Sequence, residues 1–208
     1  MPPTPHQRPR ALRTLASALP IVLAATLAAL TATAEPARAI PRHYLLETAG
    51  SSVGYEADFG KDKIVGTIPV SMANLTLDFA SLANCRVQVV LDAAAATANF
   101  PFAAQALRGP LVLDTARHPD IRFVSTAVHP KGDGALIDGN ITIRGVTRPI
   151  TLDAALYRQR GTAKGSLDRL QIRLKGTIQR DAFNADGWSS MVGNDVRIDI
   201  IADIREQG

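Results

Sequence analysis

Cysteine is almost absent from this chain of 208 residues: Cys85 is the only one. A single cysteine cannot form an intramolecular disulfide, even in an oxidising compartment. Cys85 directly precedes the alternating stretch Arg86–Asp92. We therefore expect it to be a buried or half-buried small apolar residue rather than a reactive thiol.

Motifs of metal binding and catalysis are missing as well. His43, His118 and His129 stand alone, and the sequence contains no H-x-H, H-E-x-x-H or Cys/His cluster. The ligand spacing of a metal site is therefore lacking, and we predict no metal. The sequence also has no phosphate-binding loop.

Carboxylates give no better indication of chemistry. Asp114, Asp120 and Asp181 each lie beside turn-forming neighbours. Capping or turn stabilisation accounts for such residues without a catalytic role. We predict no catalytic residues, no cofactor and no enzyme activity.

A strong charge imbalance is lacking once the first 39 residues are set aside. The whole chain has 23 basic and 19 acidic residues, a net charge of +4 and a pI of about 9.6. Four arginines and one glutamate precede position 40, so residues 40–208 carry 19 basic and 18 acidic side chains. A nearly neutral domain offers no basic face for phosphates, which argues against nucleic acid as a partner.

Long hydrophobic runs are confined to the N-terminus. Three arginines precede an apolar run from Leu15 to Leu30, and the A-x-A pattern follows at Ala32–Ala34 and at Ala37–Ala39. This order is that of a secretory signal peptide. We expect residues 1–39 to be removed, with cleavage after Ala39 favoured over Ala34, and residues 40–208 to form one domain.

Other interpretations of this leader fit less well. An uncleaved membrane anchor remains an alternative, because the run approaches the ~20 residues that span a bilayer. A lipoprotein needs a cysteine directly after the run, and a twin-arginine signal needs adjacent arginines, whereas Pro9 separates Arg8 from Arg10. We therefore expect a periplasmic or secreted protein.

Residues 40–208 alternate with a period of two. Ile172, Leu174 and Ile178 lie opposite Arg173 and Lys175 in the pattern. Such alternation places one face of a sheet in the core and the other in solvent, which favours an antiparallel sheet. The predicted strands are Ser52–Ala57, Ile64–Met72, Asn74–Phe79, Arg86–Asp92, Ile121–Val128, Ala135–Arg144, Arg148–Tyr157, Gln171–Ile178 and Asp195–Ile204.

Turn signals separate these strands. Lys131–Gly134 predicts a hairpin, and Gly66, Gly139 and Gly176 interrupt strand patterns as bulges or bends do. The alanine-rich stretch Ala93–Leu107 is where we expect a short helix. The strand pattern predicts an all-β sandwich or an up-and-down barrel. An eight-stranded barrel is either filled by side chains or holds one small ligand, and the pattern leaves both open.

Several ordered strings resemble one known family. Residues Gly139–Leu152, which read G-N-I-T-I-R-G-V-T-R-P-I-T-L, resemble the signature strand pair of the YceI-like family. The resemblance covers about Tyr44 to Ile204. The other similar segments are Ser51–Tyr55, Leu107–Asp114, His118–Phe123, Ile178–Phe183 and Val192–Val196.

The resemblance implies a lipocalin-like antiparallel barrel of about eight strands, usually periplasmic, that holds a long isoprenoid or related amphiphile. It implies a carrier or binding protein rather than an enzyme. Two segments depart from the family pattern: Glu56–Gly60 stands where members often carry a Lys-His-like pair, and Asn184–Trp188 replaces a shorter glycine-rich form. We expect both near the barrel mouth, where they would affect headgroup preference.

An isoprenoid site needs apolar walls more than reactive groups. Burying each CH₂ of a lipid tail gains ~0.8 kcal/mol, and a few polar side chains at the rim hold the head. Alternation and the resemblance together give ten candidate wall residues. They are Val53, Tyr55, Ile68, Val89, Leu91, Phe102, Leu107, Phe123, Ile143 and Leu174.

Some alternatives remain open. Arg144 and Arg148 could grip an anionic head, but Gly145 and Pro149 favour a plain turn between two strands. A filled barrel acting as a structural or protein-interaction module is the alternative function, and a lipid enzyme would need titratable groups in the cavity. Transient membrane contact and a homodimer are further expectations.

Overall fold

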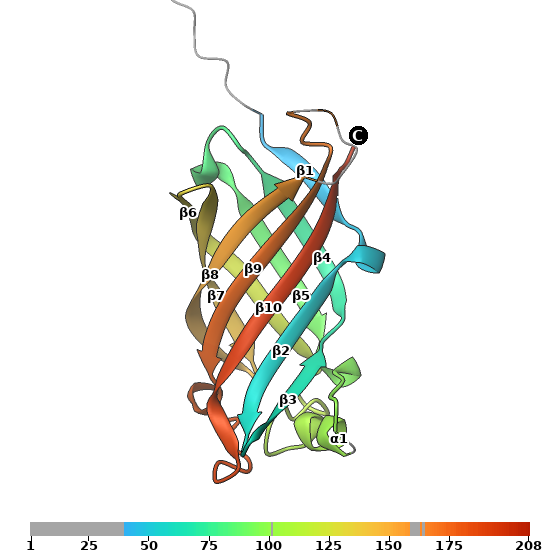
Figure 1. Ribbon diagram of the computed structural model, residues 1–208, viewed down its shortest axis with the longest axis vertical. Coiled ribbons are helices and arrows are strands. Elements are labelled where there is room, and N and C mark those ends of the chain that lie inside the picture. The colour runs from blue at the N-terminus through green and yellow to red at the C-terminus, as the bar shows by residue number, and fades with distance from the viewer. Residues whose placement is uncertain (1–39, 101, 159–162, 164) are drawn as a thin grey trace, which may run out of the picture. The chain divides into compact units, whose positions relative to one another are not determined.

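The computed structural model describes residues 40–100, 102–158, 163 and 165–208. These residues form one antiparallel sheet of ten strands that closes on itself (Figure 1). The predicted signal peptide, residues 1–39, lies outside the described residues. The strands are β1 (Arg42–Leu46), β2 (Ser52–Phe59), β3 (Asp62–Thr67), β4 (Val70–Leu77), β5 (Arg86–Asp92), β6 (Asp120–Lys131), β7 (Gly134–Ile143), β8 (Val146–Arg158), β9 (Arg169–Gln179) and β10 (Val192–Glu206).

The barrel has eight strands around its circumference, as predicted. The order β1-β4-β5-β6-β7-β8-β9-β10 closes where β1 also pairs with β10. β1 and β2 both run along β10, with Tyr44 opposite Glu206 and Ser52 opposite Ile201, and β3 extends the wall beside β2. β1 and β2 thus act as one interrupted strand.

The short helix is α1 (Ala103–Arg108), within one residue of the stretch in which it was expected. It lies at the lower end of the barrel in Figure 1. No helix among the described residues is long and apolar enough to cross a membrane. Short 3-10 turns complete the secondary structure: η1 (Thr48–Gly50), η2 (Leu82–Asn84), η3 (Ala93–Ala95) and η4 (Arg180–Phe183).

The free edge of β3 is covered by the segment that follows η3. The Thr97 amide donates to the Thr67 carbonyl and the Asn99 amide to the Val65 carbonyl, both at 2.9 Å. The Asn99 side chain accepts from the Val65 amide at 2.9 Å. This segment closes the wall beside β3. The covered edge is no longer available for pairing with a strand of another chain.

Two boundaries differ from those predicted. The expected strands Ile64–Met72 and Asn74–Phe79 are wrong: the break falls at Ile68 and Pro69, because proline has no N–H for the ladder. β1 was not predicted, since five residues carry too few alternations to stand out.

The predicted bulge is found beside one of the three glycines. The register shifts between Ser125 and Ala127 of β6, beside Gly139 of β7. Gly66 and Gly176 lie in regular register with their partners, so neither forms a bulge.

The turns follow the sequence closely. β6 and β7 are joined by the hairpin at Lys131–Gly134, where Gly132 has a φ of 53°. The turn between β7 and β8 has positive φ at Arg144 (51°) and Gly145 (75°), as a type I′ hairpin requires. Arg144 donates to the carbonyl of Pro110 at 2.6 Å. The turn interpretation of this string is therefore confirmed.

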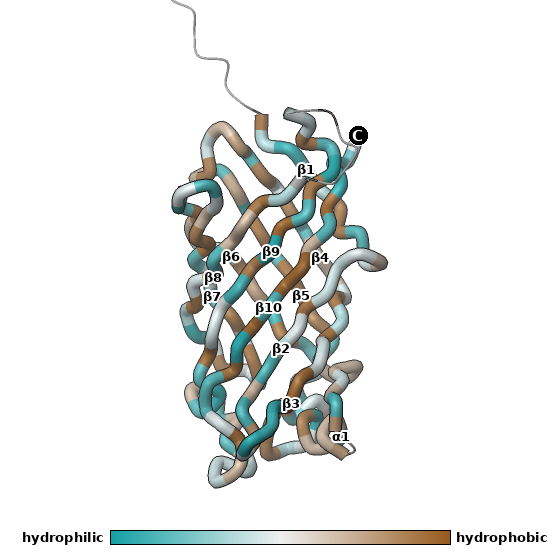
Figure 2. Tube along the Cα trace, viewed as in Figure 1, coloured by the Kyte–Doolittle hydropathy of each residue, from teal (hydrophilic) through white to brown (hydrophobic). Residues whose placement is uncertain are grey.

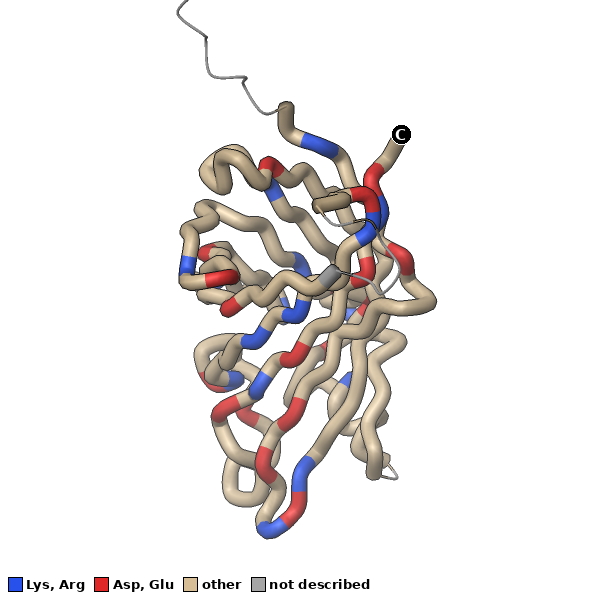
Figure 3. Tube along the Cα trace, turned by 45° about the horizontal axis from the view of Figure 1, so that its top comes forward, with Lys and Arg blue, Asp and Glu red and all other residues tan. Residues whose placement is uncertain are grey.

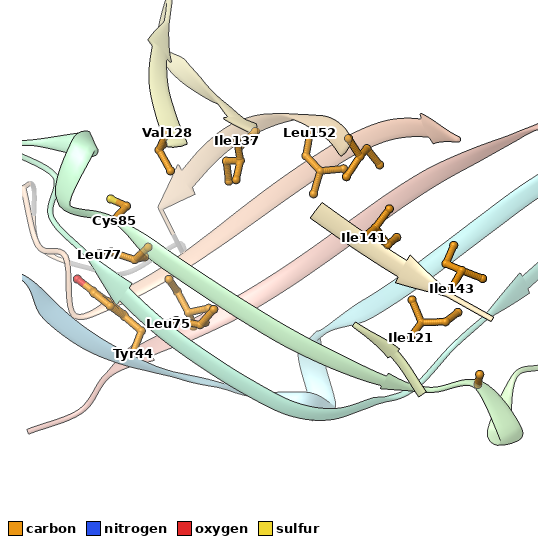
Figure 4. Close-up of a cluster of buried hydrophobic side chains, with 14 of the residues drawn as sticks. Tyr44, Leu75, Leu77, Cys85, Ile121, Val128, Ile137, Ile141, Ile143 and Leu152 are labelled. Carbon is orange, nitrogen blue, oxygen red and sulfur yellow. The ribbon is translucent and has the colours of Figure 1, made fainter. Parts of the chain in front are cut away.

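Hydropathy alternates along the strands, as Figure 2 shows. At one end of the barrel the inward side chains are tightly buried. Tyr44 is 2% exposed, its ring packs edge-to-face on Phe79 and its hydroxyl donates to the Leu167 carbonyl at 3.1 Å. Leu170 is fully buried, and Cys85 is buried beside Tyr44 and its neighbours as expected (Figure 4). We call this the closed end.

Candidate ligand-binding cavity

The opposite part of the barrel is hollow. A cavity of about 660 Å³ runs inside it, within the ~300–1,000 Å³ range of small-molecule sites. Its wall is almost entirely apolar, with aliphatic and aromatic side chains, and the only charged side chain lining it, among the described residues, is Arg180. The alternative function, a structural or protein-interaction module, predicted a barrel filled by side chains. The cavity differs from that prediction.

The structure places all ten candidate residues in the wall of this cavity. β5 illustrates the reason: Val87, Val89 and Leu91 face inward while Gln88 lies exposed on the outside. Phe102 differs from the other nine because it is 82% exposed at the cavity rim. That these residues bind a ligand stays a prediction.

Other wall residues were not among the candidates. Some could have been found from alternation in β10, such as Val196, Ile198 and Ile200. Others come from loops whose folding no periodicity predicts, such as Trp188 and Met191.

Inward glycines make room for large wall residues. A Cβ on Gly139 would lie 2.5 Å from the Phe123 ring, and one on Gly176 would lie 2.6 Å from Leu152. These glycines are therefore packing positions: each lets a neighbouring side chain lie flat along the wall, which keeps the centre of the barrel free.

The cavity reaches solvent at the end that carries α1, which we call the mouth. Phe102, Trp188 and Met191 line the cavity and are also exposed. The loop 184–191 between η4 and β10 lies at this same lower end of the barrel in Figure 1. The departure Asn184–Trp188 is thus at the mouth, as expected.

The departure Glu56–Gly60 also reaches the mouth, because Phe59 lines the cavity and the Gly60 amide donates to the Met191 carbonyl at 3.2 Å. Glu56 and Asp58 belong to β2 but point outward, where both pair with Arg197. Hydrogen bonds to Lys63 and Arg197 lower the pKa of Glu56, and the bond to Arg197 lowers the pKa of Asp58. These two carboxylates do not face the cavity, because the period of two turns them away from it, and an influence of this segment on a headgroup stays a prediction.

Arg180 fastens the mouth loop. Its guanidinium is buried and donates to four backbone carbonyls, those of Gly193 (2.9 Å), Ala185 (2.6 Å), Gly187 (2.8 Å) and Val192 (2.9 Å). Burial lowers the pKa of Arg180 from its ordinary value. The planar fork of arginine satisfies several carbonyls at once, so one side chain fixes both ends of the loop.

Tyr55 supplies the main hydroxyl in the wall. Its phenolic oxygen donates to the Thr97 carbonyl at 2.6 Å, and desolvation raises the pKa of the phenol to about 12. The group stays neutral at physiological pH. A wall with one fixed guanidinium and neutral hydroxyls can hold an apolar molecule but presents no acid and base in pair.

Metal chemistry finds no support in the geometry. Within residues 40–208, leaving out the few that the structure does not describe, no three His, Cys, Asp or Glu side chains gather as metal ligands would. Asp114 is buried, has a φ of 49° and pairs with Arg117, while its carbonyl accepts from the His118 amide. Its role is to shape a turn.

An eight-stranded antiparallel barrel around an apolar cavity has the lipocalin-like architecture. The model of the YceI-like domain matches residues 44–203, and the chain belongs to this family. A UPF0312 protein of Yersinia pestis is 30% identical over 158 residues, covering 67% of this chain and 81% of that protein.

Two solved structures have a similar fold. BcnA of Burkholderia cenocepacia superposes with a TM-score of 0.69 at 21% identity, covering 76% of this chain and 99% of that one. A polyisoprenoid binding domain from Saccharophagus degradans, described as implicated in plant cell wall breakdown, gives a TM-score of 0.55 at 12% identity, covering 80% and 99%.

Proposed function

We propose that this protein binds a long-chain isoprenoid or related amphiphilic lipid in its barrel cavity and carries it through the periplasm or the extracellular space. The observation that carries the proposal is the apolar cavity of about 660 Å³ with one closed end. The likeness to a polyisoprenoid binding domain supports the class of ligand.

The energetics favour a tail inside and a head at the mouth. Each buried CH₂ gains ~0.8 kcal/mol, so about 20 such groups give ~16 kcal/mol before association costs of ~4–15 kcal/mol. At the closed end the described side chains Tyr44 and Leu170 are buried and leave no room for a polar head. The head therefore stays near the exposed rim, where water remains available.

The proposal of transport through an aqueous compartment depends on the predicted signal peptide, because export places the protein there. N-terminal sequencing of the protein from the periplasmic or secreted fraction should give Ile40 as the first residue, or Glu35 if Ala34 precedes the cut. Recovery of the full chain in a membrane fraction would contradict the export step.

Ligand binding is tested by filling the cavity. Val89 faces inward on β5, and its neighbour Gln88 faces solvent on the same strand. Val89→Trp should reduce lipid recovered by solvent extraction and mass spectrometry at least about tenfold, which corresponds to ~1.4 kcal/mol. Gln88→Trp adds the same ring outside the barrel and should leave recovery unchanged.

The result that overturns the proposal is equally direct. Empty extracts from the unmodified protein, together with no shift of melting temperature on adding prenyl lipids, would rule out the carrier. Equal recovery from folded Val89→Trp and Gln88→Trp would place the lipid outside the cavity.

A further inference from the structure

Large apolar side chains are exposed on the loops of the mouth. Phe102 is 82% exposed, Leu111 55%, Met191 51% and Trp188 42%. They come from the start of α1, the loop after it and the loop between η4 and β10. We call these four residues the apolar rim. Exposed hydrophobic side chains gathered at one place mark an interaction surface more often than scattered ones do.

The rim is held in place by backbone contacts. The Gly187 amide donates to the Leu111 carbonyl at 3.0 Å, which joins two of the rim loops. The Met191 amide donates to the Trp188 carbonyl at 2.9 Å, and the Gly60 amide donates to the Met191 carbonyl at 3.2 Å. The rim is therefore built before any partner arrives.

Two rim residues adopt a backbone conformation that bulky side chains avoid. Phe102 has a φ of 62° and Trp188 a φ of 56°. Left-handed conformations of non-glycine residues cost ~1–3 kcal/mol and persist where surrounding contacts impose them, often at functional sites. Here they hold two aromatic rings at the mouth, although burial elsewhere would lower the free energy.

The rim continues into the cavity. Phe102, Trp188 and Met191 line the cavity as well as facing solvent. An apolar tail that leaves the barrel at the mouth therefore passes from cavity wall to rim without crossing a polar belt. Among the described residues the closed end offers no such route, since Tyr44 and Leu170 are buried there.

Charges around the mouth are balanced. Lys61 and Arg117 are exposed on its loops, and so are Asp181 and Asp186. Figure 3 shows both signs interspersed along the strands rather than gathered in one patch. Attraction to an anionic surface is thus weak, and any docking at this end depends on apolar insertion.

We propose that the apolar rim docks on a lipid bilayer, with the Trp188 and Phe102 rings at headgroup level, so that the mouth opens directly onto the source of its ligand. This inference rests on the proposed function, because a lipid tail needs a continuous apolar path from bilayer to cavity. Trp suits a bilayer interface, because its ring is apolar and its N–H can reach water, and Phe contributes apolar area to insertion.

Trp188 makes the proposal testable without a label, because it is the only tryptophan in the chain. Phosphatidylcholine vesicles added to the exported domain should shift its emission to shorter wavelength, and brominated lipids should quench it. Both effects should persist at high salt, since the docking is apolar.

Matched variants locate the docking surface. The double variant Phe102→Asp/Leu111→Asp should weaken vesicle binding by at least about tenfold. Met72→Asp/Val124→Asp places the same charges on exposed apolar positions of β4 and β6, and should bind as the unmodified protein does. Solvent extraction of both variants measures ligand loading separately.

The outcomes are distinct. No emission shift, equal vesicle binding by the two double variants, or binding abolished by salt would overturn the docking surface. A shift that depends on protein concentration without vesicles would replace the bilayer with a second copy of the chain. Vesicle binding with empty extracts would leave docking standing while removing the proposed cargo.

Discussion

The hydroxyl of Tyr55 donates a 2.6 Å hydrogen bond to the carbonyl of Thr97, across 42 positions of sequence. This bond joins the cavity wall to the segment that covers the free edge of β3. Gly66 makes the approach feasible, because a Cβ there would lie 2.5 Å from the Tyr55 hydroxyl and 2.0 Å from the Thr97 carbonyl. The lower part of the barrel wall therefore depends on one protonated phenol.

Alkaline pH should weaken this part of the barrel. The pKa of Tyr55 is raised by desolvation to about 12 in the folded protein, from an ordinary value of 10.0. A raised folded pKa stabilises the fold below pH ~10, and this stabilisation is lost as pH rises from ~10 to ~12. The free energy of unfolding, measured with urea across this pH range, should decline less steeply with pH in Tyr55→Phe than in the unmodified protein. Identical slopes would contradict the role assigned to Tyr55.

Arg180 should be essential for the mouth loop. Arg180→Met leaves four buried or part-buried carbonyls without their donor, so we expect the free energy of unfolding to fall by ~3 kcal/mol. Arg148→Met is the matched control, because Arg148 is exposed and donates only to the adjacent Thr147 carbonyl. Denaturant unfolding measures both, and equal losses would show that Arg180 does not fasten the loop.

A methyl group at position 139 should disturb the wall. Gly139→Ala brings a Cβ to 2.5 Å from the Phe123 ring and 2.7 Å from the Val124 carbonyl, so we expect a loss of ~1–3 kcal/mol. Adding Phe123→Leu should recover part of that loss, because the smaller leucine side chain removes the clash between the new Cβ and the Phe123 ring. Thermal unfolding of the single and double variants tests this coupling, and strict additivity would speak against it.

The buried thiol should be unreactive in the native protein. Cys85 is buried, its sulfur accepts from the Asp78 amide at 3.3 Å, and burial raises the pKa of the thiol. Reaction with a disulfide reagent near pH 8 should therefore be at least about 100-fold slower than in denaturant. Thr126→Cys in a Cys85→Ser background places a thiol on the exposed face of β6 and should react rapidly. Fast modification of native Cys85 would mean that the closed end opens readily.

The alternating strands predicted much of this fold. Period-two alternation in stretches such as Arg86–Asp92 determines which side chains face inward, because successive residues of a strand point to opposite sides. The segment Lys131–Gly134 determined its own hairpin through glycine conformations that other residues avoid. Seven of the ten wall residues lie in strands and could be named in this way, since strand phase is a local property. Ile68, Phe102 and Leu107 lie outside the strands, so strand phase does not account for them.

Only the tertiary structure decided where the barrel is hollow. Tyr44 and Leu170 fill one end, and the other end is open at the mouth. This difference depends on how many inward side chains from different strands meet at each level, and the sequence of one strand does not contain that information. The four carbonyls bound by Arg180 belong to residues up to 13 positions away in the sequence, and alternation says nothing of them. By itself the sequence determined an antiparallel β-domain and the inward faces of its strands; long-range packing determined the cavity, its mouth and the apolar rim.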